Sequence, residues 1–386
     1  MKDHPQTTRQ NAVWLSRERG QLEDLRRLSS RRTDPADWPH ATEVSGNIPV
    51  YDAGIIGTVD DKDLMAEWAT ILQSGPGIVA IRQAIPDQDV IDRASAIFSD
   101  IIDQEKQRGA VGDHFAKPGA NDRVWNALEK QCLADPANFA AYFSHPAIDM
   151  ISRAWLGDAY QMTAQVNRVN PGGAAQAAHR DYHLGFMSGP QMERFPSHVH
   201  QLSPMLTLQG AVAHVDMPLE SGPTLYLPYS QLFPEGYLAF PRPEFQAYFT
   251  ENHVQLPLFK GDAVFFNPAV MHAAGTNRTT NKFRLGNLLQ VSSCMGRAME
   301  TVNRSRMVKA LYPALLARAL PAPNVARVIA ASAEGYAFPT NLDRDPPIGG
   351  LAPKTQAQIM AQALAAGLSA EAFNALVDGL TERQQA

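Results

Sequence analysis

The sequence is poor in cysteine and carries no excess of positive charge. Its 386 residues include only two cysteines, Cys132 and Cys294, and no Cys-x-x-Cys pair. Cysteine-based zinc and iron–sulfur sites are therefore excluded, and a disulfide scaffold is disfavoured. The 34 Lys and Arg against 39 Asp and Glu give a formal net charge of −5, which argues against a nucleic-acid-binding protein. Any metal must be held mainly by the 11 histidines and by carboxylates.

Long apolar segments are lacking as well. No stretch approaches the ~20 apolar residues that a membrane-spanning helix needs. The N-terminal MKDHPQTTRQ has neither the apolar core nor the small-residue cleavage site of a secretory signal. Residues 1–32 are rich in arginine, as mitochondrial leaders are, but they also contain four acidic residues. We expect a cytoplasmic protein that does not associate with membranes.

Helix and strand patterns place a β core between helical flanks. Apolar residues at helical spacing predict helices over 11–29, 61–73 and 87–108, although Gly20 interrupts the first. Apolar and polar residues alternate over 162–169, as in a strand with two different faces. Further short runs, separated by Gly, Pro and Asn turns, predict an antiparallel sandwich or barrel with strands at 78–82, 205–215, 223–228, 254–259, 262–267 and 283–292.

The length suits either two domains or one elaborated domain. We expect residues 1–50 to form an N-terminal arm and 51–300 the main domain, with its β core at about 155–295. Residues 301–386 are Ala-rich, with a capping box expected at Thr355 and a helix end at Gly367. We interpret them as a helical extension packed on the same domain, so that the fold class is α+β with a mainly β core. A homodimer through these helices stays open.

One short motif carries most of the chemistry. In His179-Arg180-Asp181, residues i and i+2 of an extended strand project from the same face, which places an imidazole beside a carboxylate. His272 follows a predicted pair of strands. Two histidines and one carboxylate, with three positions left open, form the facial triad of non-heme Fe(II) oxygenases. The His-x-Asp motif alone is weak evidence, because chance matches are common.

Arg284 strengthens this interpretation. It lies 12 positions after His272, on a predicted strand, where a guanidinium group could bind a carboxylate through two parallel hydrogen bonds. An ordinary ion pair between strands is the alternative. Three ligand candidates and one arginine follow each other at separations that a single site could use.

Four segments together resemble the phytanoyl-CoA dioxygenase family, whose members are Fe(II)/2-oxoglutarate-dependent oxygenases. The resemblance covers about 76–292, and the segments are HRD at 179–181, SGPTLYLPYSQL at 221–232, GDAVFFNPAVMHAAGTN at 261–277 and FRLGN at 283–287. One departure is Ser230-Gln231, where the family usually has Ser-His. The resemblance implies a double-stranded β-helix, the jelly-roll or cupin-like barrel.

The resemblance also implies roles for individual residues. His179, Asp181 and His272 would bind iron, and Arg284 would hold the distal carboxylate of 2-oxoglutarate. These four residues would form the catalytic site. O2 would be the second cosubstrate. Halogenating relatives have a small residue in place of the carboxylate, so Asp181 favours hydroxylation over halogenation.

Further contacts to the cosubstrate are implied less directly. The family places a polar residue on the strand before the His-x-Asp motif, and Gln165 and Asn167 occupy that face here. Some relatives have a hydroxyl group two positions after the second histidine. This chain has Ala274 there, so Thr276 or a water molecule would replace that contact.

Substrate contacts are expected from two regions. The Gly-bounded loop VGDHFAKPG could close over the substrate, although a surface loop is an equal alternative. The continuation of the His-x-Asp strand could line the pocket, although aromatic residues on a barrel strand usually belong to the core and His183 is more often structural in such a place. The candidates are His114, Phe115, Lys117, Tyr182, His183 and Phe186.

The expected reaction is hydroxylation of an unactivated C–H bond of a small molecule, with release of succinate and carbon dioxide. Two alternatives remain. One is a cupin-like metal enzyme that does not use 2-oxoglutarate and would not need Arg284. The other is a non-catalytic binding protein on the same barrel, in which the loss of a ligand residue would be expected. The sequence leaves the substrate itself open.

Overall fold

A large β-sheet forms the centre of the structure. The computed structural model describes residues 12–108, 119–182, 185, 187–318 and 320–385. Neighbouring strands of the sheet are antiparallel except for β2 and β3, which are parallel. In spatial order the eight strands are β1 (Glu43–Ser45), β2 (Ile48–Asp52), β3 (Ile78–Arg82), β9 (Ala263–Phe266), β6 (Thr207–Ala213), β11 (Arg284–Ser292), β5 (Gln161–Val169) and β4 (Asn121–Val124).

A second, smaller sheet faces the large one. Its order is β10 (Met271–Ala273), β7 (Leu225–Leu227) and β8 (Val254–Gln255). A buried apolar cluster fills part of the space between the sheets, with Ile78 and Phe266 from the large sheet and Tyr226 from the small one. The expected α+β class with a two-sheet, jelly-roll-type core is therefore confirmed. Among the described residues no strand belongs to both sheets, so the barrel is not closed.

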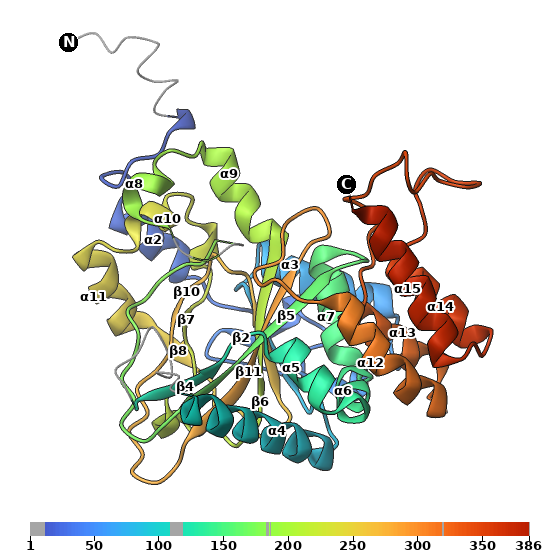
Figure 1. Ribbon diagram of the computed structural model, residues 1–386. Coiled ribbons are helices and arrows are strands. Elements are labelled where there is room, and N and C mark those ends of the chain that lie inside the picture. Colours follow the sequence, from blue (N-terminus) through green and yellow to red (C-terminus); the bar gives the residue numbers. More distant parts are fainter. Residues whose placement is uncertain (1–11, 109–118, 183–184, 186, 319, 386) are drawn as a thin grey trace.

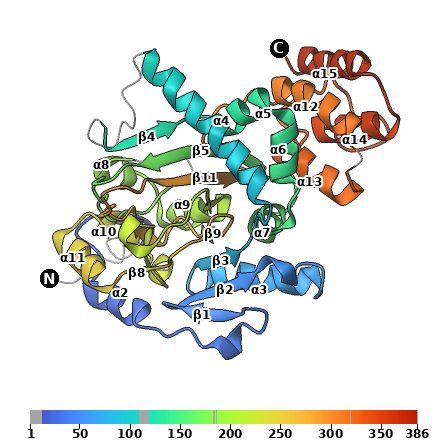
Figure 2. The same cartoon turned by 90° about the horizontal axis from the view of Figure 1, so that it is seen from below.

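Helices cover the other face of the large sheet. The helices of this layer are α3 (Asp61–Gln73), α4 (Gln88–Gln107), α5 (Ala127–Ala134), α6 (Pro136–Phe143), α7 (Pro146–Leu156), α12 (Arg304–Ala317), α13 (Ala322–Ser332), α14 (Gln356–Ala365) and α15 (Ala370–Gln384). In the view of Figure 1, α12–α15 lie on the opposite side of the sheet from β7, β8 and β10. In Figure 2, β4 and α4 lie at one edge of the large sheet, and β1–β3 with α3 lie at the other.

Strand β5 shows how this layering follows from the sequence. Met162, Ala164 and Val166 point into the helical core, whereas Gln165 and Asn167 point the other way, into the space between the sheets. A strand exposes alternate residues on its two faces. The predicted alternation over 162–169 is therefore confirmed, and it turns polar side chains toward the interior.

The N-terminal helix is shorter than expected. A helix was predicted over 11–29, but α2 spans only Leu22–Ser29. Gly20 adopts a left-handed backbone with a φ of 87°, and a Cβ there would lie 2.9 Å from Phe233 and Glu235. The chain therefore turns at Gly20 instead of continuing a helix. The remaining helices, α8 (Gly189–Met192), α9 (Ser197–Leu202), α10 (Gly236–Ala239) and α11 (Pro243–Asn252), lie with α2 near the small sheet.

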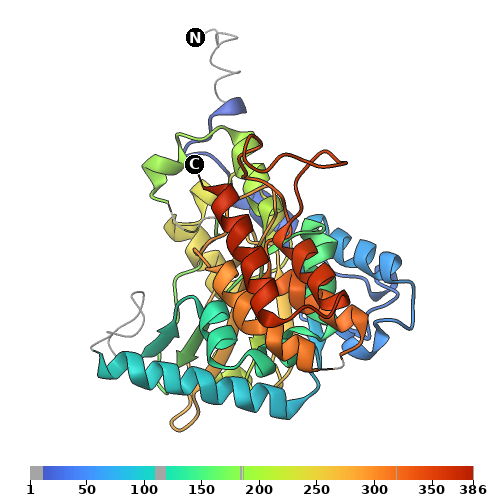
Figure 3. The same cartoon turned by 45° about the vertical axis from the view of Figure 1, so that its right-hand side comes forward.

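The C-terminal helices are tied to the central sheet by a buried arginine. Arg304 of α12 donates to the carbonyl of Met162 in β5 at 2.8 Å, and its other terminal nitrogen reaches the carbonyls of Ala331 and Ser332 at the end of α13, both at 3.5 Å. The capping box of Thr355 and Gln358 is present at the start of α14. Figure 3 shows α12–α15 as a layer on the outside of the molecule. No helix among the described residues has the length and apolar character to cross a membrane.

Candidate metal centre and its pocket

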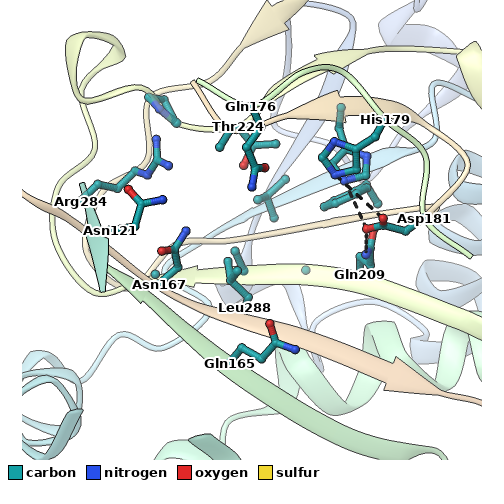
Figure 4. Close-up of a pocket in the computed structure, with 18 of the residues that line it drawn as sticks. Asn121, Gln165, Asn167, Gln176, His179, Asp181, Gln209, Thr224, Arg284 and Leu288 are labelled. Atoms are coloured by element: carbon teal, nitrogen blue, oxygen red, sulfur yellow. Dashed lines mark hydrogen bonds and ion pairs between the residues drawn. The ribbon is translucent and has the colours of Figure 1, made fainter. Parts of the chain in front are cut away.

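The three expected metal ligands come together at one point between the two sheets. His179 Nε2 lies 4.0 Å from Asp181 Oδ1, and His272 Nε2 lies 3.7 Å from Asp181 Oδ2. One potential ligand atom from each residue falls within 4.8 Å of the others. Figure 4 shows the ring of His179 above the carboxylate of Asp181, with Gln209 on the far side of that carboxylate. Two residues come from the His-x-Asp segment and the third from β10.

Both histidines are oriented by their own backbone. Nδ1 of His179 lies 2.9 Å from the carbonyl oxygen of Ala177, and Nδ1 of His272 lies 2.9 Å from that of Val270. Because a carbonyl only accepts, each Nδ1 carries the proton and each Nε2 keeps its lone pair. Such an outer hydrogen bond is the usual way in which proteins orient a metal-binding imidazole.

Asp181 is buried, and Gln209 orients it. Gln209 Nε2 donates to Asp181 Oδ2 at 2.5 Å, whereas Oδ1 has no hydrogen-bond partner in the described part of the chain. Burial acts to raise the pKa of Asp181, but the neighbouring imidazoles of His272 and His179 and the hydrogen bond from Gln209 lower it overall. The pKa of His179 is lowered, first by burial and then by His272. An ionised carboxylate and a neutral imidazole are the forms that bind a metal.

This donor set fits Fe(II). Two imidazole nitrogens and one carboxylate oxygen on one side, with thiolates absent, are the ligands of a facial-triad iron site. The triad also opens into a cavity of about 860 Å³, so that other molecules can reach the remaining positions around a metal. The unpaired Oδ1 of Asp181 is a buried acceptor that a metal ion would satisfy.

Arg284 lines the same cavity. It is the first residue of β11, its side chain is buried, and burial lowers its pKa to about 10, still far above neutral. Within the described part of the chain, its side chain donates only two long hydrogen bonds, to the carbonyls of Ser221 and Gly275 at 3.3 and 3.4 Å. No salt bridge to Arg284 is present among the described residues. A buried guanidinium group without a counter-ion is suited to bind an anion that enters the cavity.

Of the other residues expected to contact the cosubstrate, two lie in the cavity lining and one does not. Gln165 and Asn167 line the cavity, and Asn167 Oδ1 has no partner among the described residues. Thr276 lies outside the cavity lining: it is exposed, and its hydroxyl group accepts from the backbone N–H of Ala175 at 3.0 Å. The expected role of Thr276 is therefore wrong, because the chain leaves the cavity after Gly275, which packs against Gly222. Thr224 supplies a hydroxyl group in the lining instead.

The expected substrate residues are mostly outside the described part of the chain. His114, Phe115, Lys117, His183 and Phe186 belong to this undescribed group. Tyr182 is described and does not line the cavity. Its ring stacks on Tyr237 at 4.3 Å, and its hydroxyl group lies 2.5 Å from His200 Nδ1. Tyr182 is thus a packing residue behind the metal ligands, which corrects the expectation.

Sequence reasoning missed several lining residues, among them Arg123, Trp125 and Gln209. Arg123 and Trp125 reach the cavity only because β4 pairs with β5, and Gln209 only because β6 passes under Asp181. The departure at Gln231 is structural: its side chain donates to the carbonyl of Gly75 at 2.8 Å. Alternation along NDRVW was the one signal that could have pointed to Arg123 and Trp125.

Two histidines and a carboxylate facing a buried arginine, between the sheets of a jelly-roll-type core, define a site of the non-heme iron oxygenase class. The sequence profile of the family described as phytanoyl-CoA dioxygenase (PhyH) matches residues 67–286. The match covers more than half of the chain, and the chain belongs to this family. The resemblance drawn from the sequence is thereby confirmed, and so are Fe(II) and 2-oxoglutarate as the cofactors of the family.

The individual proteins that this chain resembles share only a modest part of its sequence. Dioxygenase trt7 from Aspergillus terreus (strain NIH 2624 / FGSC A1156) is 30% identical over 137 residues, which are 36% of this chain and 42% of that protein. The match thus spans less than half the length of this curated relative. Among solved structures, the non-heme alpha ketoglutarate dependent epimerase SnoN from nogalamycin biosynthesis is 19% identical, with a TM-score of 0.43 over 60% of this chain and 82% of its own. The carbocyclase SnoK from nogalamycin biosynthesis is 18% identical, with a TM-score of 0.43 over 61% and 86%.

Proposed function

We propose that this protein is an Fe(II)- and 2-oxoglutarate-dependent dioxygenase that hydroxylates a C–H bond of a small molecule. The observation that carries the proposal is the position of Arg284, a buried cation that shares one cavity with His179, Asp181 and His272. A metal site and an anion site in one cavity are what a chelating cosubstrate with two carboxylates requires. When bound, iron and 2-oxoglutarate would activate O2, so that one oxygen atom enters succinate, released with carbon dioxide, and the other enters the substrate.

The residues of the chain would bind and orient these groups. The Nε2 atoms of His179 and His272 and the carboxylate of Asp181 would hold iron, and Arg284 would bind the distal carboxylate of 2-oxoglutarate through two parallel hydrogen bonds. Burial strengthens these charge interactions, because little water competes for them. The carboxylate of Asp181 occupies the position that a halide would need, which favours hydroxylation over halogenation.

The two alternative functions would need different residues at this site. A cupin-like metal enzyme without 2-oxoglutarate has no use for a buried, unpaired arginine beside the metal ligands. A non-catalytic binding protein has no need of three oriented ligands, whereas both imidazoles here turn their Nε2 atoms to a common point. The dioxygenase accounts for both observations.

Arg284→Gln tests the proposal. Anaerobic titration of the Fe(II)-loaded protein with 2-oxoglutarate should produce a weak visible charge-transfer band in the natural protein. The variant should need about 10–100 times more 2-oxoglutarate for the same band, because it loses a charge-assisted pair of hydrogen bonds. The exposed Arg278 supplies the control, Arg278→Gln, which should titrate like the natural protein.

Two results would contradict the proposal. Unchanged 2-oxoglutarate affinity and turnover in Arg284→Gln would remove the role of Arg284 and favour the cupin-like alternative. No band in the folded natural protein would remove the dioxygenase itself. A screen of small molecules for substrate-stimulated succinate formation, with product analysis, would show whether the product carries a new hydroxyl group.

Three further expectations remain predictions: the cytoplasmic setting, the absence of nucleic-acid partners and a possible homodimer through α12–α15. Analytical ultracentrifugation would test the homodimer.

A further inference from the structure

A glutamine in the cavity wall has one end of its amide group bonded and the other end without a partner. Gln165 of β5 lines the cavity and is 3% exposed. Its Oε1 accepts from Arg123 of β4 at 2.8 Å, whereas its Nε2 has no hydrogen-bond partner among the described residues. A buried donor without an acceptor costs free energy unless a ligand supplies one. The wall at Gln165 is therefore suited to a ligand atom that accepts a hydrogen bond.

The contact with Arg123 fixes which way round this amide group lies. An arginine side chain has only donors, so the amide oxygen of Gln165 must face it and the amide nitrogen must point away. Half a turn of the amide group would bring its two N–H groups against those of the guanidinium group. Gln165 therefore offers a ligand a donor and not an acceptor.

The cosubstrate is not the natural partner of this donor. In the sheet register, Arg284 pairs with Val169 of β5. Gln165 lies four residues away along that strand, opposite Leu288. Figure 4 shows Gln165 well away from the path between Arg284 and the metal ligands, with Leu288 nearer to that path. A 2-oxoglutarate molecule that spans Arg284 and the metal would leave the amide nitrogen of Gln165 to another ligand.

The charges of the loaded cavity favour an uncharged ligand. Apart from the imidazoles of the two metal ligands, the charged side chains among the described lining residues are Asp181, Arg284 and Arg123. The metal with Asp181 would match one carboxylate of the cosubstrate, and Arg284 would match the other. Arg123 lies close enough to Glu300 to lower the pKa of that carboxyl group, although burial raises this pKa overall. An ion buried without an opposite charge costs much free energy, so a charged substrate would be disfavoured here.

We propose that the substrate is an uncharged carbonyl compound, whose carbonyl oxygen accepts a hydrogen bond from Gln165 Nε2 and whose apolar body fills the cavity toward the metal. The inference rests on the proposed function and names the substrate class of that same site. Leu288 and Met299 supply apolar contacts in the lining. A cavity of about 860 Å³ is at the upper end of the range for small-molecule sites and has room for such a compound beside the cosubstrate.

Probes of one shape test the absence of charge. The ketone 4-phenylbutan-2-one and the acid 3-phenylpropanoate carry the same phenylethyl group on a carbonyl carbon and differ only in a methyl group or a charged oxygen. The protein, loaded anaerobically with Fe(II) and 2-oxoglutarate, is titrated with each by calorimetry. The ketone should bind about tenfold or more tightly than the acid, because the loaded cavity has no opposite charge for the carboxylate.

Gln165→Glu tests the direction of the hydrogen bond. One oxygen of the new carboxylate can still accept from Arg123, but the other places an acceptor where the natural protein has a donor. The natural protein should bind the ketone at least as tightly as the alcohol 4-phenylbutan-2-ol. The variant should bind the ketone about tenfold more weakly than the natural protein and should prefer the alcohol, whose hydroxyl group can donate to the carboxylate. A purely structural role of Gln165 would not reverse this preference.

The control is Gln362→Glu, the same change at an exposed position of α14, which should keep the preferences of the natural protein. If the natural protein shows the 2-oxoglutarate charge-transfer band but does not bind the ketone more tightly than the acid, the inference is wrong. It is equally wrong if Gln165→Glu keeps the natural order of ketone and alcohol, or if this variant loses the band, since Gln165 would then belong to the cosubstrate. A band missing from the natural protein marks failure of the proposed function, which separates the two cases.

Discussion

The backbones of His179 and His272 hydrogen-bond to each other in both directions. The N–H of His179 donates to the carbonyl of His272 at 2.9 Å, and the N–H of His272 donates to the carbonyl of His179 at 3.0 Å. The rings on this pair lie 4.4 Å apart between centroids. Two ligands from distant parts of the chain are thus placed by strand pairing, which does not depend on a metal ion.

Metal removal should therefore leave the fold intact. Chelation of the Fe(II) form should keep the circular dichroism spectrum and a cooperative unfolding transition. The free energy of unfolding should fall only by the amount that metal binding adds to the folded state. That amount is about 2.7 kcal/mol when free metal is at 100 times its dissociation constant. Thermal unfolding with and without chelator measures the difference. Collapse of the secondary structure on chelation would show that the metal, and not the strand pairing, holds the histidines.

Gln209→Met should weaken metal binding without unfolding the protein. The substitution keeps the length of the side chain but removes the donor that orients Asp181. Loss of such an outer partner typically costs 10–100-fold in metal affinity. Competition with a coloured chelator measures the Fe(II) affinity. The control is Gln290→Met, since Gln290 is the register partner of Gln209 on β11, and a similar loss in this variant would rule out a specific effect through Asp181.

His214 should make the protein less stable in mild acid. It is fully buried between Ser95 and Tyr142, and this burial lowers its pKa to about 3 from the usual 6.5. Between these two pH values the unfolded chain binds a proton that the folded protein does not. Its contribution to the free energy of unfolding therefore falls as the pH drops from about 6.5, by up to about 1.4 kcal/mol per pH unit.

Urea unfolding between pH 4 and pH 7 measures this slope. His214→Gln should show a shallower dependence of the unfolding free energy on pH than the natural protein, by about one bound proton. The exposed His198 supplies the control, His198→Gln, which should leave the slope as it is. Equal slopes in all three proteins would mean that His214 does not titrate on unfolding.

Gly236→Ala should destabilise the protein through Arg180. A Cβ at Gly236 would overlap the guanidinium group of Arg180, which is buried and donates to the carbonyls of Phe233 and Ser230. Overpacking of this kind costs about 1–3 kcal/mol. Denaturant unfolding measures the loss. The control is Gly350→Ala, where the added atom meets only one neighbour, at 3.9 Å; equal stability of the two variants would contradict the prediction.

The metal ligands could be predicted because their signal is local. A His-x-Asp segment in an extended chain places both side chains on one face whatever the rest of the fold does. The alternation over 162–169 likewise predicted which side chains of β5 face the cavity. Thr276 was assigned wrongly because the same reasoning was extended past the end of β10, where the chain turns away.

Residues that depend on pairing between distant segments could not be predicted in the same way. Gln209 contacts Asp181 only after β6 has taken its place between β9 and β11. The break before α2 also has a tertiary cause, because Gly20 packs against Phe233 and Glu235. The spacing of apolar residues describes a single helix or strand. A contact between two elements depends on how both are placed in the fold, which this spacing does not contain.

The position of β4 at the edge of the large sheet separates two tasks of the molecule. The metal ligands come from segments that pair with each other beside the small sheet, whereas Arg123 comes from a strand with a neighbour on one side only. An edge strand can change its side chains without disturbing a second ladder of hydrogen bonds. The cavity wall on β4 should therefore be open to redesign, or to evolutionary drift, while the metal ligands keep their positions.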